Sequence, residues 1–449
     1  MNRETPSELV SARDKPTEAD LWQCYQASRG GWTEPMLRTL EKGPKGNKWH
    51  SLIDKVWSER TLAIAWEKVE LNAGACGVDN ITIDYFAKDS KARLLAIKEQ
   101  LTKQTYQPQA IKRVWIPKPG SSEERPLGIP TVKDRVVQTA LKLVIEPIFE
   151  MQFAPTSYGF RPGRDCKAAL REVERLLHSG YTHVVDVDIK GYFDAIPHAP
   201  LMQLVKERIA DRRVLDLIEA FLSQGEMSEG VEMKSRQGSP QGGVISPLLA
   251  NIYLNPLDWL LSELGYQSAR YADDLVILTK SAEAAQQALT ELEQWMGQAQ
   301  LTLHPIKTRL VDMSQPRASF EFLGYRFLRT KGGKVLRLVR DKSKKKLRAR
   351  IKIHTKRANG KSLSEIIAQI NPILRGWFNY FKPAHASEHS EISGWVRMRL
   401  RSILRKRAGG RGRGKDHRKW SNDYFDRHGI FNLEAARIEA LSLWRRAKC

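Results

Sequence analysis

Two adjacent carboxylates stand in the segment YADD at residues 271–274, directly before the apolar run LVIL at 275–278. Like charges a few ångströms apart raise each other's pKa unless a cation neutralises them. Carboxylate oxygens suit Mg²⁺, which binds one or two protein carboxylates and completes its shell with water and substrate phosphate. Asp273 and Asp274 therefore form a candidate metal site at the tip of a hairpin. An ordinary polar turn is the alternative, because Asp favours turns in any protein.

A second source of carboxylates is the segment HVVDVDIKGYFD at residues 183–194. Its valines and Ile189 predict a strand, in which Asp186 and Asp188 project on one face because side chains alternate along a strand. A carboxylate from this strand that met the hairpin would complete a site for two metal ions about 3.5 to 4 Å apart, as in enzymes of phosphoryl transfer. The alternation does not choose between Asp186 and Asp188, and Asp194 is a third candidate.

Several longer segments resemble one protein family. The order and spacing of a reverse transcriptase palm are matched by DIKGYFD at 188–194, QGSPQGGVISPLLANIYL at 237–254, YADD at 271–274, LTLHPIKT at 301–308 and FLGY at 322–325. The fingers of reverse transcriptases encoded by group II introns resemble IPKPGSSEERPLGIPTVKDRVVQ at 116–138 and SYGFRPGRDC at 157–166. The maturase, or X, domain that follows the palm in those proteins is similar to INPILRGWFNYF at 370–381. The resemblance covers roughly residues 50–430.

The resemblance implies a role for each residue of the candidate metal site. Asp188 and Asp273 would be the catalytic aspartates, with Asp274 in a supporting role, and the backbone carbonyl of Ile189 would be a further metal ligand. The cofactor would be two Mg²⁺ ions, for which Mn²⁺ could substitute. Lys307 would assist at the leaving pyrophosphate, as an acid or through its charge, with a simple surface lysine as the alternative.

The resemblance also implies a site for the incoming deoxynucleotide. Lys118 and Arg125 flank a Gly-Ser-Ser-Glu-Glu turn and match triphosphate-binding positions, with a solvated loop as the alternative. A guanidinium binds phosphate oxygens bidentately, whereas an ammonium acts as a point charge. Gln241 would contact the nucleotide, and its neighbouring glycines permit close backbone approach. Phe193 would be the sugar gate that clashes with a ribose 2′-hydroxyl, or else a core aromatic. The primer-gripping hairpin would contain Phe322, Gly324 and Tyr325.

Basic charge is concentrated in the C-terminal part of the chain. Residues 331–449 hold 32 of the 74 Lys and Arg and 9 of the 51 Asp and Glu, so the remaining residues hold 42 of each sign and are neutral. A domain this basic binds phosphates by counterion release, with a steep salt dependence whatever the base sequence. The candidate nucleic-acid contacts are Lys344, Lys345, Lys346, Arg348, Arg350, Arg375, Arg397, Arg399, Arg401, Arg405, Arg411 and Arg413.

The dense basic segments have different predicted structures. Residues 341–357 predict a helix, whereas residues 397–419 predict a basic amphipathic helix that breaks into a flexible Gly-Arg segment. Between them, one apolar face at helical spacing predicts a thumb core rather than an RNA-stacking platform. This face consists of Ile370, Ile373, Leu374, Trp377, Phe378 and Phe381. Arg375 lies on another face of that helix and is freer to touch RNA.

The elements that must position these residues are expected to form an α+β right-hand polymerase, with fingers, a palm on an antiparallel sheet, an α-helical thumb or maturase domain, and a basic C-terminal region that binds DNA or RNA. The expected divisions are a polar extension at 1–50, an N-terminal lid and fingers at 51–180, the palm at 181–335, the thumb or X domain at 336–390, and the basic region at 391–449.

The expected function is an RNA-directed DNA polymerase of a group II intron that also binds the intron RNA and promotes its splicing and retrotransposition. Its partners would be the intron RNA, an RNA template with a DNA primer, dNTPs and target DNA. The alternatives are a domesticated reverse transcriptase of defence or repair, and an RNA-binding splicing factor with a vestigial polymerase site.

The remaining sequence features concern location and further domains. The chain has no apolar run near the ~18 residues that span a bilayer and no signal-peptide core, which predicts a cytoplasmic protein without a membrane partner. Its four cysteines form no CxxC pair, and no Cys-rich HNH endonuclease pattern is expected at the C-terminal end.

Overall fold

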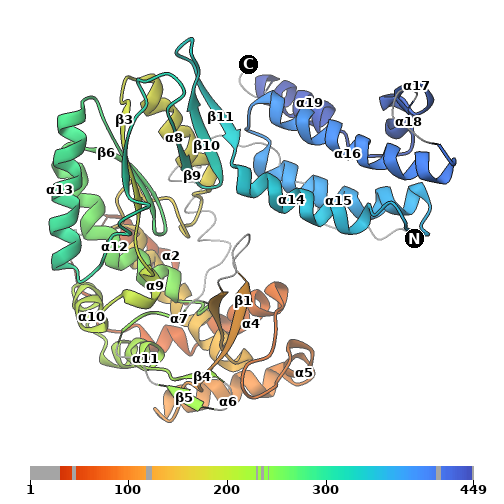
Figure 1. Cartoon of the computed structure of the whole chain (residues 1–449). Coiled ribbons are helices and arrows are strands. Elements are labelled where there is room, and N and C mark those ends of the chain that lie inside the picture. The colour runs from red at the N-terminus through yellow and green to blue at the C-terminus, as the bar shows by residue number, and fades with distance from the viewer. Residues whose placement is uncertain are drawn as a thin grey trace. The chain divides into compact units, whose positions relative to one another are not determined.

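The computed structural model describes residues 31–42, 47–117, 124–228, 231–233, 237–240, 242–410 and 416–446 (Figure 1). These residues fall into two compact units, one within Pro16–Asp312 and the other within Met313–Cys449. Both units combine helices with antiparallel strands, so the expected α+β class is confirmed. The division lies at 312/313, so residues 313–335, which were expected to end the palm, group with the C-terminal helices.

The first unit begins with helices that pack around a small sheet. The helices before the sheet are α2 (Glu34–Lys42), α3 (Ile53–Val56), α4 (Glu59–Asn72), α5 (Ile83–Ala87) and α6 (Ser90–Thr102). The sheet has the order β2-β1-β4-β5, built from β1 (Ile111–Pro117), β2 (Glu124–Ile129), β4 (Glu226–Ser228) and β5 (Val231–Met233). Helix α7 (Val132–Glu150) follows β2 and packs against α4. Most of α7 is buried, including its polar residues Asp134, Gln138 and Thr139.

The second sheet of this unit carries the predicted carboxylates. Its order is β6-β7-β3-β8, with β3 (His183–Asp188), β6 (Gln267–Tyr271), β7 (Asp274–Thr279) and β8 (Arg309–Asp312). All its pairings are antiparallel. The alternation expected for β3 is confirmed, because Val185 and Val187 enter the main hydrophobic core while Asp186 and Asp188 stay partly exposed.

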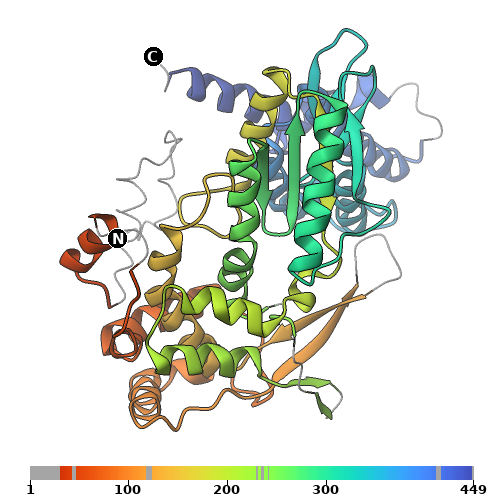
Figure 2. The same ribbon diagram turned by 90° about the vertical axis from the view of Figure 1, so that its left-hand side faces the viewer.

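Helices cover this sheet and connect its strands. They are α8 (Cys166–His178), α9 (Tyr192–Ala195), α10 (His198–Lys206), α11 (Arg212–Leu222), α12 (Ser246–Glu263) and α13 (Ala282–Gln298). Figure 2 shows α13 lying along the strands, and α13 contacts β3, β7 and β8. Helix α12 contacts β6 and is buried over most of its length, which makes it the support of the strand that leads to YADD.

The second unit is a three-stranded sheet followed by helices. The strands β9 (Ser319–Phe322), β10 (Tyr325–Arg329) and β11 (Val335–Val339) pair in the order β11-β10-β9. The helices are α14 (Asp341–His354), α15 (Leu363–Phe381), α16 (Ala386–Arg407), α17 (Asp416–Lys419), α18 (Asn422–Arg427) and α19 (Leu433–Arg446). Helix α14 packs against α15, and α16 packs against α19.

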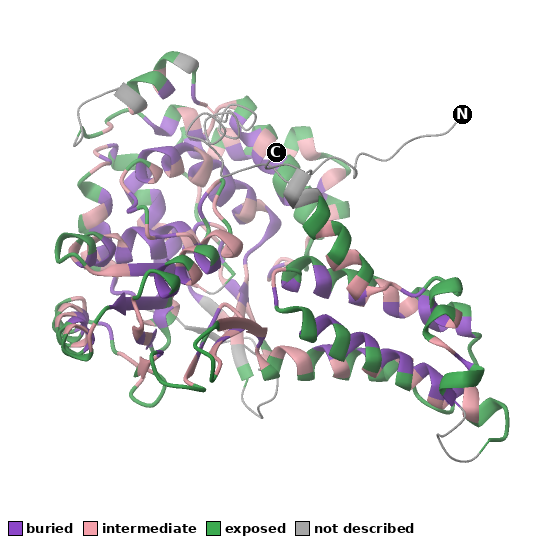
Figure 3. Cartoon of the chain, turned by 90° about the horizontal axis from the view of Figure 1, so that it is seen from above, coloured by how far each residue is buried: buried purple, intermediate pink, exposed green. Residues whose placement is uncertain are grey.

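Two helical expectations for this unit are confirmed. The basic segment at 341–357 forms α14, and the apolar face of α15 is buried except for Ile373, which is partly exposed. A capping box at the start of α15 satisfies two backbone N–H groups, because Ser362 and Glu365 bond to each other's backbone nitrogen. Figure 3 shows the buried residues of these helices as stripes with exposed residues on the other sides. In the described part of the chain, no helix is both long and apolar enough to cross a bilayer.

Candidate active site

The YADD segment closes the hairpin between β6 and β7, as the sequence predicted. Tyr271 and Asp274 are paired across the hairpin, which leaves Ala272 and Asp273 as a two-residue loop. Ala272 has φ +59°, a left-handed conformation that residues other than glycine rarely adopt outside tight turns. The direction in which Asp273 leaves the turn is therefore set by a backbone conformation that is uncommon for residues other than glycine.

Asp188 is the strand carboxylate that meets this hairpin. In the pairing of β3 with β7, Asp188 lies opposite Asp274. Asp186 instead forms an ion pair with Arg309, with 3.0 Å between Nε and Oδ2. Asp194 lies beyond the end of β3, in α9. Of the three alternatives left open by the sequence, the structure brings Asp188 to the YADD hairpin.

The electrostatics of Asp273 reflect a crowded site. Burial is the main cause that raises the pKa of Asp273, and the nearby Asp188 carboxylate raises it further. The charges of Arg270 and Lys307 act in the opposite direction on the same pKa. Lys307 forms an ion pair with Asp188, with 3.0 Å between Nζ and Oδ2. Lys307 therefore lies at the carboxylates, although its side chain is exposed.

These residues fit a hard divalent cation. Two carboxylates that repel each other gain free energy when a cation lies between them, and oxygen donors suit Mg²⁺ better than they suit Zn²⁺. Within the described residues no group of three or more His, Cys, Asp or Glu side chains is clustered for metal binding. A metal held here would thus have few protein ligands and would take the remainder of its shell from water and phosphate, as Mg²⁺ does.

The residues after Asp188 connect the site to the 237–240 segment. The Ile189 side chain is buried, and α9 starts after Gly191 with the half-buried ring of Phe193 beside that of Tyr192. The Phe193 carbonyl accepts a hydrogen bond of 2.7 Å from the backbone N–H of Ser239. A Cβ on Gly238 would lie 2.9 Å from the Asp194 carbonyl oxygen, so only glycine fits this approach without movement.

Only some of the residues predicted to bind the nucleotide lie within the described structure. Lys118 and Gln241 lie outside the described residues. The backbone of Arg125 lies in β2 opposite Ile116. Next to Gln241, a Cβ on Gly242 would lie 2.1 Å from the Gly128 carbonyl oxygen, so this loop runs directly against the backbone of β2. Gly242 thus permits a close approach between two backbone segments, whereas the approach of this loop to a nucleotide stays a prediction.

The FLGY segment forms a tight turn whose aromatic rings point inward. Phe322 and Tyr325 are paired, with Leu323 at φ +48° and Gly324 at φ +80° between them. Both rings are buried, and the Tyr325 hydroxyl donates a 2.6 Å hydrogen bond to the carbonyl of Tyr380. The two side chains therefore belong to the core of the second unit, and the primer-gripping role of this hairpin stays a prediction. Only the turn itself, including Gly324, is partly exposed.

Two of the predicted nucleic-acid contacts are corrected by the structure. Arg397 and Arg401 are 5% and 4% exposed; Arg397 pairs with Asp426 at 3.3 Å, and Arg401 donates to the Trp420 carbonyl at 2.8 Å. These arginines bind α16 to the segment that contains Trp420 and Asp426, and because they are buried they are not accessible to RNA. The amphipathic pattern at 397–419 had suggested an exposed basic face.

Other predicted basic contacts divide into paired and exposed groups. The partly exposed residues with partners inside the unit are Lys344 (with Glu388 and Glu391), Arg348 (with Glu391), Arg399 (with the Thr355 carbonyl) and Arg405 (with Asp416). The exposed residues are Lys345, Lys346, Arg350 and Arg375, the last with its guanidinium 4.6 Å from the ring centroid of Phe431. Arg411 and Arg413 lie outside the described residues.

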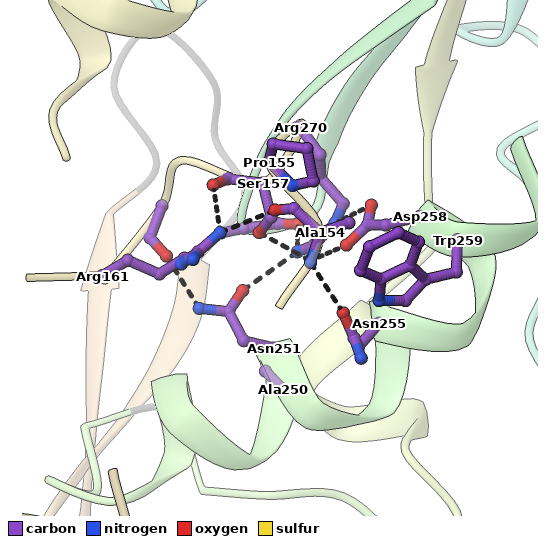
Figure 4. Close-up of polar contacts among 12 residues, drawn as sticks. Ala154, Pro155, Ser157, Arg161, Ala250, Asn251, Asn255, Asp258, Trp259 and Arg270 are labelled. Carbon is purple, nitrogen blue, oxygen red and sulfur yellow. Dashed lines mark hydrogen bonds and ion pairs between the residues drawn. The ribbon is translucent and has the colours of Figure 1, made fainter. Parts of the chain in front are cut away.

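The sequence analysis missed the polar network beneath the YADD hairpin. Arg270, the residue before Tyr271, is fully buried and pairs with the equally buried Asp258 of α12 (Figure 4). Asn251, about two turns earlier on the same helix, also accepts a hydrogen bond from Arg270. The available signal in the sequence was an arginine directly before YADD, together with a lone Asp in the mostly apolar sequence of α12.

Comparisons with known proteins cover both units. Residues 116–327 match the family described as reverse transcriptase (RNA-dependent DNA polymerase), and residues 344–422 match the group II intron maturase-specific domain. The chain is 34% identical over 295 residues to Protein YkfC of Escherichia coli (strain K12), an alignment that covers 56% of this chain and 76% of YkfC.

Two further similarities are more partial. Over 203 residues the chain is 38% identical to the group II intron-encoded protein LtrA of Lactococcus lactis subsp. cremoris, which covers 45% of this chain but only 33% of LtrA. The solved partial Cas6-RT-Cas1--Cas2 complex is 25% identical with a TM-score of 0.37, covering 55% of this chain and 43% of that chain.

Proposed function

The chain belongs to the group II intron type of the reverse transcriptase family, and from this premise we propose that it is an RNA-directed DNA polymerase that also binds intron RNA. The observation that carries the proposal is the register that sets Asp188 opposite Asp274, with Asp273 at the adjacent hairpin tip and Lys307 at 3.0 Å from Asp188. Residues 51–180 would act as lid and fingers, and the sheet of β3, β6, β7 and β8 as the palm.

Each residue of the site has a proposed role in nucleotide transfer. Asp188, Asp273 and the Ile189 carbonyl would hold Mg²⁺, or Mn²⁺ in its place, with Asp274 in support. When bound, the metal supplies activation of the primer 3′-hydroxyl and neutralises charge on the leaving pyrophosphate. Lys307 provides a mobile positive charge next to the carboxylates, where it can stabilise or protonate the leaving group.

The incoming dNTP and the nucleic acids would be bound by surrounding residues. Lys118, Arg125 and Gln241 would contact the nucleotide, and Phe193 would exclude a 2′-hydroxyl. The exposed residues Lys345, Lys346, Arg350 and Arg375 would contact RNA phosphates, in an intron RNA or in the template with its DNA primer. Splicing, retrotransposition and binding of target DNA are proposed on the similarity of residues 344–422 to the maturase-specific domain.

Substitution of the hairpin carboxylates tests the polymerase proposal. The double variant Asp273→Ala/Asp274→Ala should lose Mg²⁺-dependent extension of a DNA primer on an RNA template, because the metal loses its ligands. Its affinity for the same RNA should change by less than about twofold, since phosphate binding comes from the basic second unit. Both quantities are measurable on one preparation, by gel extension and filter binding.

Asp186→Asn is the matched control for this experiment. Asp186 lies on the same strand face as Asp188 but is paired with Arg309, so its substitution should leave primer extension intact. Full extension by the double variant would refute the metal assignment. Tight RNA binding by a wild-type chain that never extends a primer would favour an RNA-binding splicing factor instead.

A further inference from the structure

Arg270 is the largest fully buried side chain in the described protein, and its position is unusual for a charge. It is the residue of β6 directly before YADD, and both Arg270 and Asp258 are 0% exposed. A buried charge is unfavourable unless it is paired and all its hydrogen bonds are satisfied. An apolar residue would fill this place in an ordinary strand, so the ion pair needs a reason beyond packing.

The guanidinium of Arg270 uses every donor that it has. Nε and Nη2 donate to the two carboxylate oxygens of Asp258, a bidentate pairing. The second Nη2 hydrogen reaches Ser157 Oγ at 2.8 Å. Nη1 donates to Asn251 Oδ1 at 2.9 Å and to the Ala272 carbonyl oxygen at 2.9 Å. An arginine has five N–H donors, so the network is complete.

One of these bonds ends on the catalytic hairpin. The Ala272 carbonyl belongs to the peptide that joins Ala272 to Asp273, so its direction also sets the direction in which Asp273 leaves the turn. Ala272 has the left-handed φ of +59°, which a non-glycine residue keeps only when surrounding contacts hold it. The bond from Nη1 is such a contact.

The same network fixes the other side of the turn. Asn251 accepts from Arg270 and donates through Nδ2 to the Gly159 carbonyl at 2.7 Å. Gly159 lies so close that a Cβ on it would be 2.4 Å from the Ala272 nitrogen. In addition, the Arg270 backbone bonds to Thr156 and Tyr158. The hairpin is thus held between α12 and the 156–159 segment, as Figure 4 shows for Ser157, Asn251, Asp258 and Arg270.

We propose that Arg270, oriented by Asp258, is a positioning residue that holds the Ala272 carbonyl and thereby aims the Asp273 carboxylate at the divalent metal shared with Asp188. This inference rests on the proposed polymerase function and adds residues that do not touch the metal, the nucleotide or the primer. Arg270 acts through the backbone of the hairpin, and Asp258 acts by fixing the plane of the guanidinium.

Two conservative substitutions separate this role from general stability. Arg270→Lys keeps the charge but loses the planar fork that reaches Asp258 and Ala272 together. Asp258→Asn keeps the shape but removes the bidentate acceptor, and it serves if Arg270→Lys does not fold. Arg397→Lys is the matched control, because Arg397 is also a buried arginine with a carboxylate partner, Asp426 at 3.3 Å. This pair lies in the second unit, and neither residue belongs to the network around the hairpin.

Metal binding is read without catalysis, by titrating the full chain with Mn²⁺ and following the electron paramagnetic resonance signal of free Mn²⁺. Primer extension is then measured as a function of Mg²⁺ concentration. We expect weaker Mn²⁺ binding, a higher half-saturating Mg²⁺ concentration and a turnover lowered by about tenfold to hundredfold in Arg270→Lys and Asp258→Asn, the range for a misplaced catalytic group. Arg397→Lys should lose thermal stability and keep wild-type metal dependence.

The outcomes distinguish this inference from the proposed function. Wild-type metal affinity and metal dependence in a folded Arg270→Lys or Asp258→Asn variant would overturn the positioning role while the polymerase stands. An equal effect of Arg397→Lys on metal dependence would also overturn it, since any buried pair would then serve. A wild-type chain that binds Mn²⁺ but never extends a primer, with weaker Mn²⁺ binding in Arg270→Lys, would refute the polymerase and leave the positioning role standing.

Discussion

Asp273 carries a conflict between folding and function at the scale of a single residue. Its side chain is half-buried, and this burial raises its pKa above the usual value of 3.8. At neutral pH the metal-free protein therefore holds an ionised group in an environment that disfavours the charge. A metal ion would remove this conflict, whereas the positive charges of Arg270 and Lys307 reduce it only in part.

The sign of this effect gives a prediction for stability. Because the folded state raises the pKa of Asp273, it binds the proton more tightly than the unfolded chain, so the group destabilises the fold at any pH above its folded pKa. Asp273→Asn should raise the Tm of the metal-free protein at pH 7, and the gain should vanish as the pH falls below about 4. Thermal unfolding in chelator at both pH values measures it. A lower Tm for the variant at pH 7 would contradict the assigned burial effect.

Phe193 gives a second prediction at this scale. Its ring is half-buried, which is compatible with a gate that is supported from behind by the core. Phe193→Ala should raise the incorporation of ribonucleotides relative to deoxynucleotides by at least about tenfold, since ~1.4 kcal/mol of steric discrimination corresponds to that factor. Single-nucleotide extension with matched dNTP and rNTP pairs measures the ratio, and the dNTP reaction is the internal control. Unchanged sugar selectivity would make Phe193 a core residue only.

At the scale of elements, the site depends on how closely a loop and a hairpin approach. Gly159→Ala places a Cβ 2.4 Å from the Ala272 nitrogen and must push the 156–159 segment away from the turn. We expect a loss of about 1 to 3 kcal/mol in stability together with slower primer extension. Gly297→Ala is the control, because nothing lies within 4 Å of that position in α13 and alanine favours a helix by about 0.5 to 1 kcal/mol. Equal activity in both variants would contradict the close packing.

Elements with a clear period were the predictable ones. The alternation of β3 and the apolar face of α15 follow from burial alone, so sequence and structure agree on them. The side chains of Arg397 and Arg401 were misassigned because an arginine on a helix has no pattern that distinguishes an exposed phosphate contact from a buried bond to a distant carbonyl. The burial of Phe322 and Tyr325 could not be predicted for a similar reason, since it depends on residues of α15 more than 50 positions away, such as Tyr380.

The choice of Asp188 over Asp186 lay beyond strand periodicity, although the family resemblance already implied Asp188. Both side chains share a strand face, and in the structure the register with β7 and the pairing of Asp186 with Arg309 separate them. Register is a property of two strands together. The Arg270 network could not be predicted, because its partners Ser157, Asn251, Asp258 and Ala272 come from three separate segments that only the fold brings together.

At the scale of the whole molecule, charge is distributed very unevenly along the chain. The net charge of +23 belongs to residues 331–449, but part of that charge is bound internally, as in Arg397, Arg401 and Lys344. The positive charge that RNA can reach is that of the exposed Lys and Arg side chains of α14 and α15. The capacity to bind phosphate is therefore smaller than the composition suggests, and it resides in identifiable residues.

The salt dependence of RNA binding tests this distribution. Lys345→Gln/Lys346→Gln/Arg350→Gln should lower the slope of log affinity against log salt concentration by about 2 to 3, since each phosphate contact contributes ~0.7 to 0.9. The control Lys91→Gln/Lys103→Gln/Lys206→Gln removes the same charge from exposed positions in α6, directly after α6 and at the end of α10, and should change the slope by less than about 1. Equal slopes for the two triple variants would show that net charge, and not this helix, determines binding.

The strand order β6-β7-β3-β8 has a consequence for the protein while it is being made. Strand β3 is the first strand of this sheet to leave the ribosome, but one of its edges stays unpaired until residue 279 has emerged and the other until residue 312. Asp188 cannot meet Asp273 before the first of these points, and it cannot meet Lys307 before residue 307 has emerged. A nascent chain that is shorter than this therefore has no assembled carboxylate site and could not begin DNA synthesis on the message from which it is translated.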